Sequence, residues 1–307
     1  MADTKKSLCI FIHFSEQQDI PHYVTIFVNE LSKYFDDVIL SSNPKVLKQI
    51  PPFSKNVTLQ FDENYGYDFG RFYAVFKSIE QENYNRIACI NDSNILINSL
   101  ENILNFENID QFDFWGVLDS NEKPWFLEIS NPYHIQSHFL IFNQEAINVL
   151  EKYFRSVDMT EFFREENSKL LRYKVINHWE FGVSQFMESE GLKIGHYFDC
   201  NEITDLYKIR NDANISHKLY EELLLHGYPM IKKKVLFDQK SQTDDKEESW
   251  KILIRKYGHS AWELDRLIDE IVELKNEVRR IKRPGLINKI MIHLHQRFIK
   301  YNIKLTK

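Results

Sequence analysis

This chain has little glycine, little cysteine and no long apolar run. Only 9 of its 307 residues are glycine, which excludes collagen-like and glycine-rich repeat architectures. Its cysteines, Cys9, Cys89 and Cys200, are far apart and form no Cys-x-x-Cys pair. We therefore expect neither a zinc finger nor a disulfide framework, and we expect the protein to occupy a reducing compartment. No run of 18 apolar residues occurs, so we expect no transmembrane helix. We also expect no signal peptide, because the apolar stretch near the start is short and Ser15 and Glu16 follow it at once.

What the sequence does contain is typical of a folded protein with a large core. Hydrophobic residues make up 43% and charged residues 27%, and the aromatic content is 14%. These values exclude intrinsic disorder and supply bulky side chains for burial. The length of 307 residues is enough for two domains or one large one.

Charge is distributed unevenly along the chain. The net charge is −6, yet residues 279–307 hold nine Lys or Arg and no Asp or Glu. The other 278 residues therefore carry 30 basic and 45 acidic groups. An acidic body binds the phosphates of nucleic acid poorly, so we expect no nucleic-acid partner.

The first hundred residues alternate between strand-like and helix-like patterns. Such alternation predicts βαβ units and a parallel sheet, and therefore an α/β fold. Strands are expected over residues 7–14, 37–40, 58–61 and 86–90, and helices over 20–35 and 70–80.

The pattern changes in the second part of the chain. Strands are expected over 112–117, 125–129, 137–142 and 192–198, and helices over 143–191 and 216–226. Residues 238–249 are polar and rich in charge, which indicates a linker. The sequence therefore predicts a main α/β domain over 1–237, a linker over 238–249 and a helical extension over 250–307.

Two segments of the extension have amphipathic spacing. Apolar residues between Leu264 and Ile281 repeat in heptads, which predicts either a homo-oligomer or packing onto the body. Residues 286–305 are apolar on one face, with Lys and Arg between. This segment fits the inner leaflet of a membrane, and alternatively it docks on the acidic body. We therefore expect a cytoplasmic protein, peripheral at the inner membrane.

Polar residues follow the predicted parallel strands where ligands bind in open α/β sheets. His13 ends the first strand, ENYGYDFGR (63–71) follows the third, and Asn91-Asp92-Ser93 follows the fourth. Gly66 allows close approach of the backbone to a ligand, and the start of a helix favours anionic groups. A tight turn capped by Asp68 is the alternative. Tyr67, and with it Tyr65, is a candidate to stack on a nucleobase.

Asp92 is a candidate metal ligand. One or two carboxylates together with substrate phosphates commonly hold Mg²⁺, and Mn²⁺ has similar preferences. A divalent cation is therefore a candidate cofactor. A local turn made by the Asp92 side chain explains the same residue without a metal.

Several motifs, in this order and spacing, resemble the rhamnan synthesis protein F family of bacterial glycosyltransferases. The resemblance extends from about residue 7 to residue 234. Its specific part is ENYGYDFG, followed about twenty residues later by Asn-Asp-Ser. The supporting segments are IFIHF (10–14), HIQSHFLIF (134–142), WEFGVSQ (179–185) and PMIKK (229–233).

The resemblance implies a glycosyltransferase-A-type fold, a Rossmann-like mixed sheet flanked by helices. It also implies a nucleotide-sugar donor, with dTDP-L-rhamnose as the first candidate and a UDP-hexose as the alternative. The acceptor would be a bacterial surface polysaccharide, such as O-antigen or capsule, or a lipid-linked glycan. The Asp-x-Asp metal motif usual in this fold is absent, and Asn91-Asp92-Ser93 takes its place.

Inverting transfer needs a base near the acceptor hydroxyl and cations near the departing diphosphate. Glu180 is the predicted base because it opens an apparent helix over 180–190, although a first-turn Glu also simply favours the helix dipole. A non-catalytic scaffold that retains the fold is the alternative to an enzyme. The predicted donor site comprises His13, Asn64, Gly66, Tyr67, Asp68, Arg71, Asn91, Asp92 and Ser93, and the predicted acceptor or phosphate site His134, His138, His178, Lys232 and Lys233.

Overall fold

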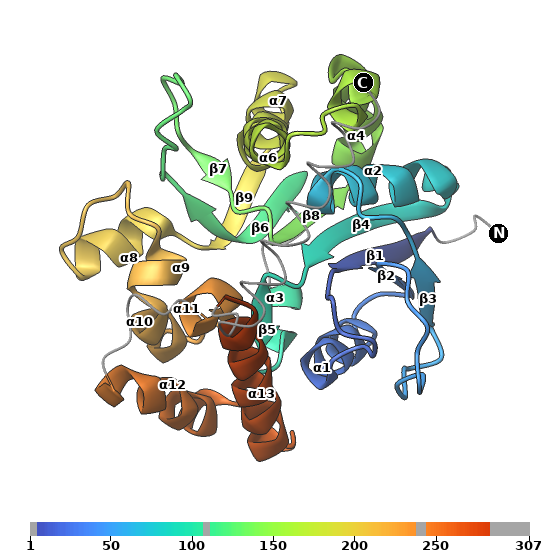
Figure 1. Ribbon diagram of the computed structural model, residues 1–307. Coiled ribbons are helices and arrows are strands. Elements are labelled where there is room, and N and C mark those ends of the chain that lie inside the picture. Colours follow the sequence, from blue (N-terminus) through green and yellow to red (C-terminus); the bar gives the residue numbers. More distant parts are fainter. Residues whose placement is uncertain (1–4, 107–110, 238–243, 283–307) are drawn as a thin grey trace, which may run out of the picture.

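The computed structural model describes residues 5–106, 111–237 and 244–282. Within them, one eight-stranded mixed sheet forms the centre of the molecule (Figure 1). Its strands lie in the order β3-β2-β1-β4-β8-β6-β7, and β9 pairs with β6. The bounds are β1 Lys6–His13, β2 Asp37–Ser42, β3 Val57–Phe61, β4 Tyr84–Asn91, β6 Phe114–Ser120, β7 His134–Ile135, β8 Phe139–Asn143 and β9 Ile194–Phe198. The predicted α/β class is confirmed.

The first four strands of the sheet are parallel. Leu8, Ile10 and Phe11 of β1 are fully buried, because a central parallel strand is covered by helices on both faces. Strand β1 lies between β2 and β4, so the strand order reverses there. The carboxyl ends of β1 and β4 thus form the topological switch point at which α/β folds bind ligands.

Helices cover both faces of the sheet (Figure 1). One face is covered by aromatic-rich helices, where Phe69 and Phe72 of α2 stack near Trp179. Helix α1 lies on the other face. The remaining helices follow in chain order: α1 His22–Leu31, α2 Tyr67–Ser78, α3 Glu101–Leu104, α4 Gln144–Ser156, α5 Met159–Phe163, α6 Ser168–Val175, the π-helical turn η3 Ile176–Gly182, α7 Val183–Ser189, α8 Cys200–Leu206, α9 Ile215–Lys218, α10 Tyr220–Leu225 and α11 Lys233–Phe237, with a 3-10 turn η1 at Gln81–Asn83.

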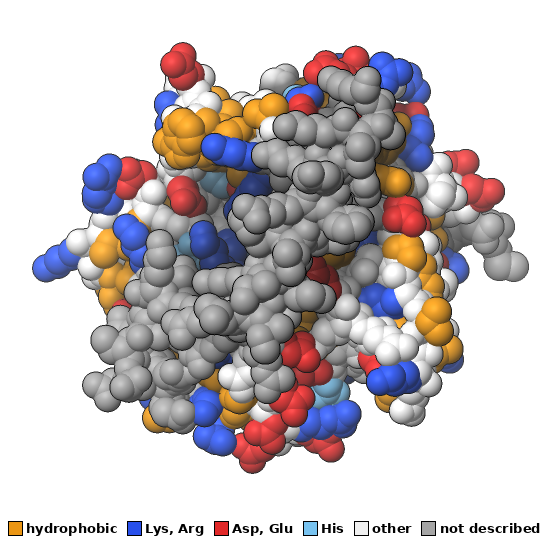
Figure 2. All heavy atoms as spheres, viewed as in Figure 1, with side chains coloured by type: hydrophobic (Ala, Val, Ile, Leu, Met, Phe, Trp, Pro, Cys, Tyr) orange, Lys and Arg blue, Asp and Glu red, His pale blue; other side chains and the backbone are white. Residues whose placement is uncertain are grey.

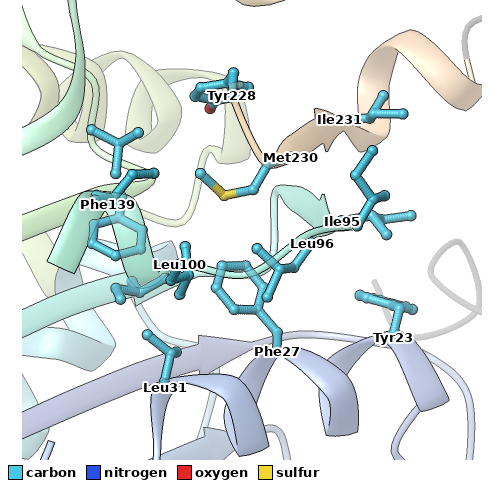
Figure 3. Packing of buried hydrophobic residues seen from close by; sticks show 14 of the residues in the cluster. Tyr23, Phe27, Leu31, Ile95, Leu96, Leu100, Phe139, Tyr228, Met230 and Ile231 are labelled. Carbon is cyan, nitrogen blue, oxygen red and sulfur yellow. The ribbon is translucent and has the colours of Figure 1, made fainter. Parts of the chain in front are cut away.

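A small second sheet connects distant parts of the chain. Strands β5 (Asn94–Leu96) and β10 (Met230–Lys232) pair in antiparallel fashion, and neither was predicted. Their apolar side chains pack with Phe27 of α1 and with Tyr228 (Figure 3). This pairing brings the PMIKK segment to the end of β4.

Two sequence predictions are wrong in detail. Residues 125–129 form no strand, and Trp125 is 84% exposed. This segment belongs to a surface loop between β6 and β7. Glu180 does not open a helix, because the helical path runs from α6 through η3 to α7 without a break. The helix-dipole explanation of Glu180 therefore fails.

The C-terminal helices pack on the body of the protein. Helix α12 (Asp244–Tyr257) begins inside the segment predicted as a linker, and α13 spans Leu264–Lys282. Leu267 and Ile271 of the heptad seam are fully buried in the core that also contains Phe27. These two positions are therefore already covered within the chain, and an oligomer through the seam stays a prediction. The basic segment 286–305 lies outside the described residues, and none of the described helices is long and apolar enough to cross a bilayer.

Candidate functional site

A charged cluster lies at the switch point. The Lys233 ammonium is 2.7 Å from Oδ2 of Asp92, and the Tyr23 hydroxyl donates to the same oxygen at 3.2 Å. His13 Nε2 lies 3.7 Å from that oxygen, and His13 Nδ1 is 3.0 Å from the Ser42 hydroxyl. Burial alone would raise the pKa of the Asp92 carboxyl, but the Lys233 ammonium and the hydrogen bonds from Lys233 and Tyr23 lower it below its usual value. Asp92 is therefore held as a carboxylate.

His13 is neutral at physiological pH. Its side chain is fully buried, and this burial lowers its pKa to about 4 despite the opposing charge of Asp92. The only fixed positive charge in direct contact with Asp92 among the described residues is thus the Lys233 ammonium.

The Arg71 side chain is buried and hydrogen-bonds to two strands. It is 1% exposed. Its guanidinium donates to the carbonyl oxygen of His13 at 2.7 Å and to the Ser41 hydroxyl at 2.9 Å. Ser41 in turn donates to Asp62 at 2.6 Å. Arg71 therefore joins the ends of β1 and β2. Donor contact by Arg71, as predicted, would require these bonds to be replaced.

Next to this cluster lies a polar cavity of about 170 Å³. Seven of its lining residues come from the predicted set: Asp68, Asn91, Ser93, His134, His138, Glu180 and Lys232. Five were missed: Ser120, Glu122, Gln136, Ser137 and Asn214. Ser120 ends β6 at the same edge of the sheet, so the strand-end rule could have found it. Asn214 comes from a loop with no motif.

Glu180 lines this cavity and is the candidate base. Burial raises the pKa of its carboxyl to about 7, although Lys232 acts in the opposite direction. The π-helical turn η3 places Trp179 and Phe181 in the core and leaves Glu180 at the cavity. Single π turns inside helices frequently occur at functional sites. A base works best when its pKa is near the working pH.

The other walls offer neutral hydrogen-bonding groups. His134 Nδ1 is 2.8 Å from the carbonyl oxygen of Pro132. A carbonyl only accepts, so Nδ1 carries the proton and Nε2 is an acceptor. Burial lowers the pKa of His134 to about 4 and that of His138 to about 3. His138 Nε2 contacts the Tyr228 hydroxyl at 2.9 Å. Such groups suit sugar hydroxyls rather than a charged phosphate.

Asp68 and Asn91 connect the two parts of the site. Asn91 donates to Oδ2 of Asp68 at 2.7 Å, and burial raises the pKa of Asp68. Asp68 lies in the first turn of α2, whose cap is Gly66, so the predicted capping role is wrong.

Eight predicted residues do not line the cavity. Four of them, His13, Arg71, Asp92 and Lys233, belong to the neighbouring cluster at the strand ends, and the other four are Asn64, Gly66, Tyr67 and His178. Gly66 has φ +75°, and a Cβ there would lie 2.5 Å from the Phe162 ring. Its observed role is close packing. Trp115 and Trp179 are buried in the core.

The residues around Asp92 do not fit a resident divalent ion. One Asp92 oxygen already accepts from an ammonium and a phenol. Among the described residues, the one group of three metal-type ligands is Asp119, His196 and Asp199, away from Asp92. We therefore derive no catalytic step through a metal at Asp92.

On the face shown in Figure 2, acidic and basic side chains are interspersed over the part formed by described residues. Neither sign dominates there.

Comparisons with known proteins give curated relatives, solved structures and a family model. Two curated proteins, both called virulence protein VirA and both from Vibrio anguillarum, are 26% identical over 204 residues, which is 57% of this chain and 61% of theirs. The chain thus spans less than two thirds of these relatives. Two solved structures align at low TM-scores. One is a putative glucose-1-phosphate thymidylyltransferase from Bacillus anthracis (TM-score 0.41, 7% identity, 63% of this chain and 87% of that one). The other is a 4-diphosphocytidyl-2C-methyl-D-erythritol synthase from Anaerococcus prevotii (0.39, 13%, 63% and 89%).

The family model for rhamnan synthesis protein F matches residues 42–301, which is 260 of the 307 residues. This match extends past residue 234, where the motif resemblance ends, and includes α12 and α13. The chain belongs to the rhamnan synthesis protein F family.

Proposed function

We propose that this protein is an inverting glycosyltransferase of bacterial polysaccharide synthesis, with a nucleotide-sugar donor and a glycan or lipid-linked acceptor. The observation that carries the proposal is the position of the Glu180 carboxyl. It lines a sugar-sized cavity next to the switch point, and its pKa is raised to about 7. Membership of the family supports the polysaccharide assignment. The first candidate donor is dTDP-L-rhamnose, and a UDP-hexose is the alternative.

In this mechanism Glu180 takes the proton of the acceptor hydroxyl. The hydroxyl oxygen then forms a bond to the anomeric carbon, and the bond from that carbon to the diphosphate oxygen breaks. The electron pair of the broken bond leaves on the diphosphate. The proton ends on Glu180 and is released to solvent after the product leaves.

Two consecutive lysines supply the positive charge that the departing diphosphate needs. Lys233 faces Asp92 at the end of β4, and Lys232 lines the cavity. Fixed cations in a water-poor site stabilise developing negative charge strongly. The cavity of about 170 Å³ is below the range of pockets for drug-sized ligands, so it holds one sugar ring and not the whole donor. The nucleotide then lies outward, over the ends of β1 and β2.

The test is transfer of radiolabelled sugar from dTDP-L-rhamnose, or from UDP-glucose in parallel, into lipid-extractable material of bacterial membranes. Glu180→Gln should lower transfer by a factor of about 10²–10⁴, the usual contribution of a positioned base. Glu188→Gln is the matched control, because Glu188 is on α7 and exposed. Full activity of Glu180→Gln would contradict the assignment of the base.

A scaffold without catalysis is the second candidate. It is favoured by one observation: the Asp92 carboxylate already has internal partners and needs no ligand to satisfy it. Thermal shift with dTDP, UDP, GDP and CMP separates the two candidates, since a ligand that binds only the folded state raises its melting temperature. An enzyme should respond to one nucleotide, and a scaffold to none.

A further inference from the structure

A cluster of three ligand-type side chains lies outside the site described above. Asp119 is near the end of β6, His196 is on β9, and Asp199 follows β9 directly. Because β6 and β9 pair in parallel, with Leu118 beside Phe198, their carboxyl ends coincide. One ligand atom from each of the three residues lies within 4.8 Å of the others.

The two carboxylates are oriented by the backbone. Asp119 Oδ1 accepts from the amide of Cys200 at 2.6 Å. Asp199 Oδ1 accepts from the amides of Asn201 at 2.7 Å and Glu202 at 3.3 Å. In each residue this leaves Oδ2 to face His196. Backbone donors that fix one oxygen and leave the other free are typical of the outer shell of metal sites.

The distances between His196 and the two carboxylates are too long for direct hydrogen bonds. His196 Nδ1 lies 3.7 Å from Asp119 Oδ2, and His196 Nε2 lies 3.5 Å from Asp199 Oδ2. Hydrogen bonds of this kind are about 2.7–3.2 Å long. One ion takes only one imidazole nitrogen, and Nδ1 contacts the Tyr133 hydroxyl, which leaves Nε2 for an ion. Tetrahedral ligands that are each about 2.1 Å from zinc stand about 3.4 Å apart, close to the 3.5 Å between Nε2 and Asp199 Oδ2.

A second observation points to a missing partner. Asp119 is fully buried, and its Oδ2 has no hydrogen-bond partner. A buried oxygen that lacks a partner is costly in a native protein and requires an explanation. The Tyr133 hydroxyl, 3.1 Å from His196 Nδ1, orients the ring as outer-shell groups do for metal-binding histidines.

We propose that Asp119, His196 and Asp199 bind a first-row divalent cation, Zn²⁺ or Mn²⁺. One imidazole and two carboxylates are ligands that both ions accept. The ion would fix the ends of β6 and β9 and the start of α8 beside Ser120, which lines the cavity. This site does not depend on the proposed function, and it differs from the metal site predicted at Asp92.

The test uses the full chain after removal of metals with a chelator. The protein is dialysed to equilibrium against ZnCl₂ or MnCl₂ alone, and bound metal is measured by elemental analysis. We expect one ion per chain and a rise in melting temperature. His196→Gln and Asp199→Asn should each weaken binding at least tenfold. Asn also caps helices well, so Asp199→Asn preserves the start of α8.

Two controls define the site. His226→Gln should leave binding unchanged, because His226 also contacts a tyrosine hydroxyl, that of Tyr207, but is outside the cluster. Asp92→Asn should also leave it unchanged. The proposal is overturned if no stoichiometric ion binds. It is equally overturned if binding survives in His196→Gln and Asp199→Asn, or is lost in Asp92→Asn alone.

Discussion

The ammonium of Lys233 lies 2.7 Å from Oδ2 of Asp92, although 141 positions separate the two residues in the chain. The β5–β10 pairing brings them together, because Lys233 directly follows β10 and its amide donates to the carbonyl of Ser93. A cation supplied by the chain itself thus contacts the carboxylate that the sequence offered as a metal ligand. The predictions below start from this pair.

Breaking the pair should cost stability. Lys233→Met leaves the Asp92 carboxylate without its cation. Removal of one partner of a fully buried pair costs about 3–5 kcal/mol, and the loss here should be smaller because the Lys233 and Asp92 side chains are 20% and 13% exposed. Part of this loss should be recovered in the double variant Asp92→Asn with Lys233→Met. Urea unfolding of the four proteins in this cycle measures the coupling. Lys234→Met, which changes an exposed neighbour, is the control. Strict additivity of the two single changes would show that the contact contributes nothing.

The rate of sugar transfer should rise with pH through about 7. Glu180 acts as a base only when ionised, and its pKa is raised to about 7. Below that value the carboxyl is protonated and activity falls tenfold per pH unit. The measurement is kcat/KM from pH 5 to 9. A profile that is flat between pH 5 and 7 contradicts the role of Glu180.

The Glu180→Gln variant should be more stable than the parent at pH 8. A carboxyl whose pKa is raised in the folded state loses stability as pH rises from its unfolded pKa, about 4.3, to its folded value. Removing this ionisation should therefore stabilise the fold by about 3–4 kcal/mol at pH 8 and by little at pH 4. Thermal unfolding at both pH values tests the difference. Equal effects at pH 4 and pH 8 would show that the stability change does not arise from the ionisation of Glu180.

Gly66→Ala should be much more destabilising than Gly191→Ala. Both glycines have positive φ, +75° and +80°, and a non-glycine residue there costs about 1–2 kcal/mol. A Cβ at Gly191 meets nothing within 4 Å, whereas at Gly66 it meets Phe162 at 2.5 Å. Overpacking adds about 1–3 kcal/mol. Urea unfolding of the two variants isolates this clash, and similar losses would show that the Phe162 ring simply moves aside.

Local patterns predicted the parallel part of the sheet well, because each central strand is a continuous apolar run that needs no distant partner to be recognised. They failed at residues 125–129, where apolar residues lie in an exposed loop. They also missed β5 and β10, which are three residues long. Each of these strands exists only because the other is beside it.

The residues of the site were likewise predicted only in part from the sequence. Strand-end positions and motifs selected Asp68, Asn91, Ser93, Glu180 and Lys232, and all of these line one cavity. Sequence could not show that Arg71 is used inside the fold, since its partners are a carbonyl and a hydroxyl on two other strands. It also gave no sign of Asp119, His196 and Asp199 as a cluster.

By itself the sequence determined the fold class, the family and the residue types available for chemistry, because apolar periodicity and motif spacing are local properties of the chain. The tertiary structure decided which of those residues meet and in which protonation state. The pKa of Glu180 depends on burial by neighbours from distant segments. The charge facing Asp92 depends on a strand pairing across more than a hundred residues.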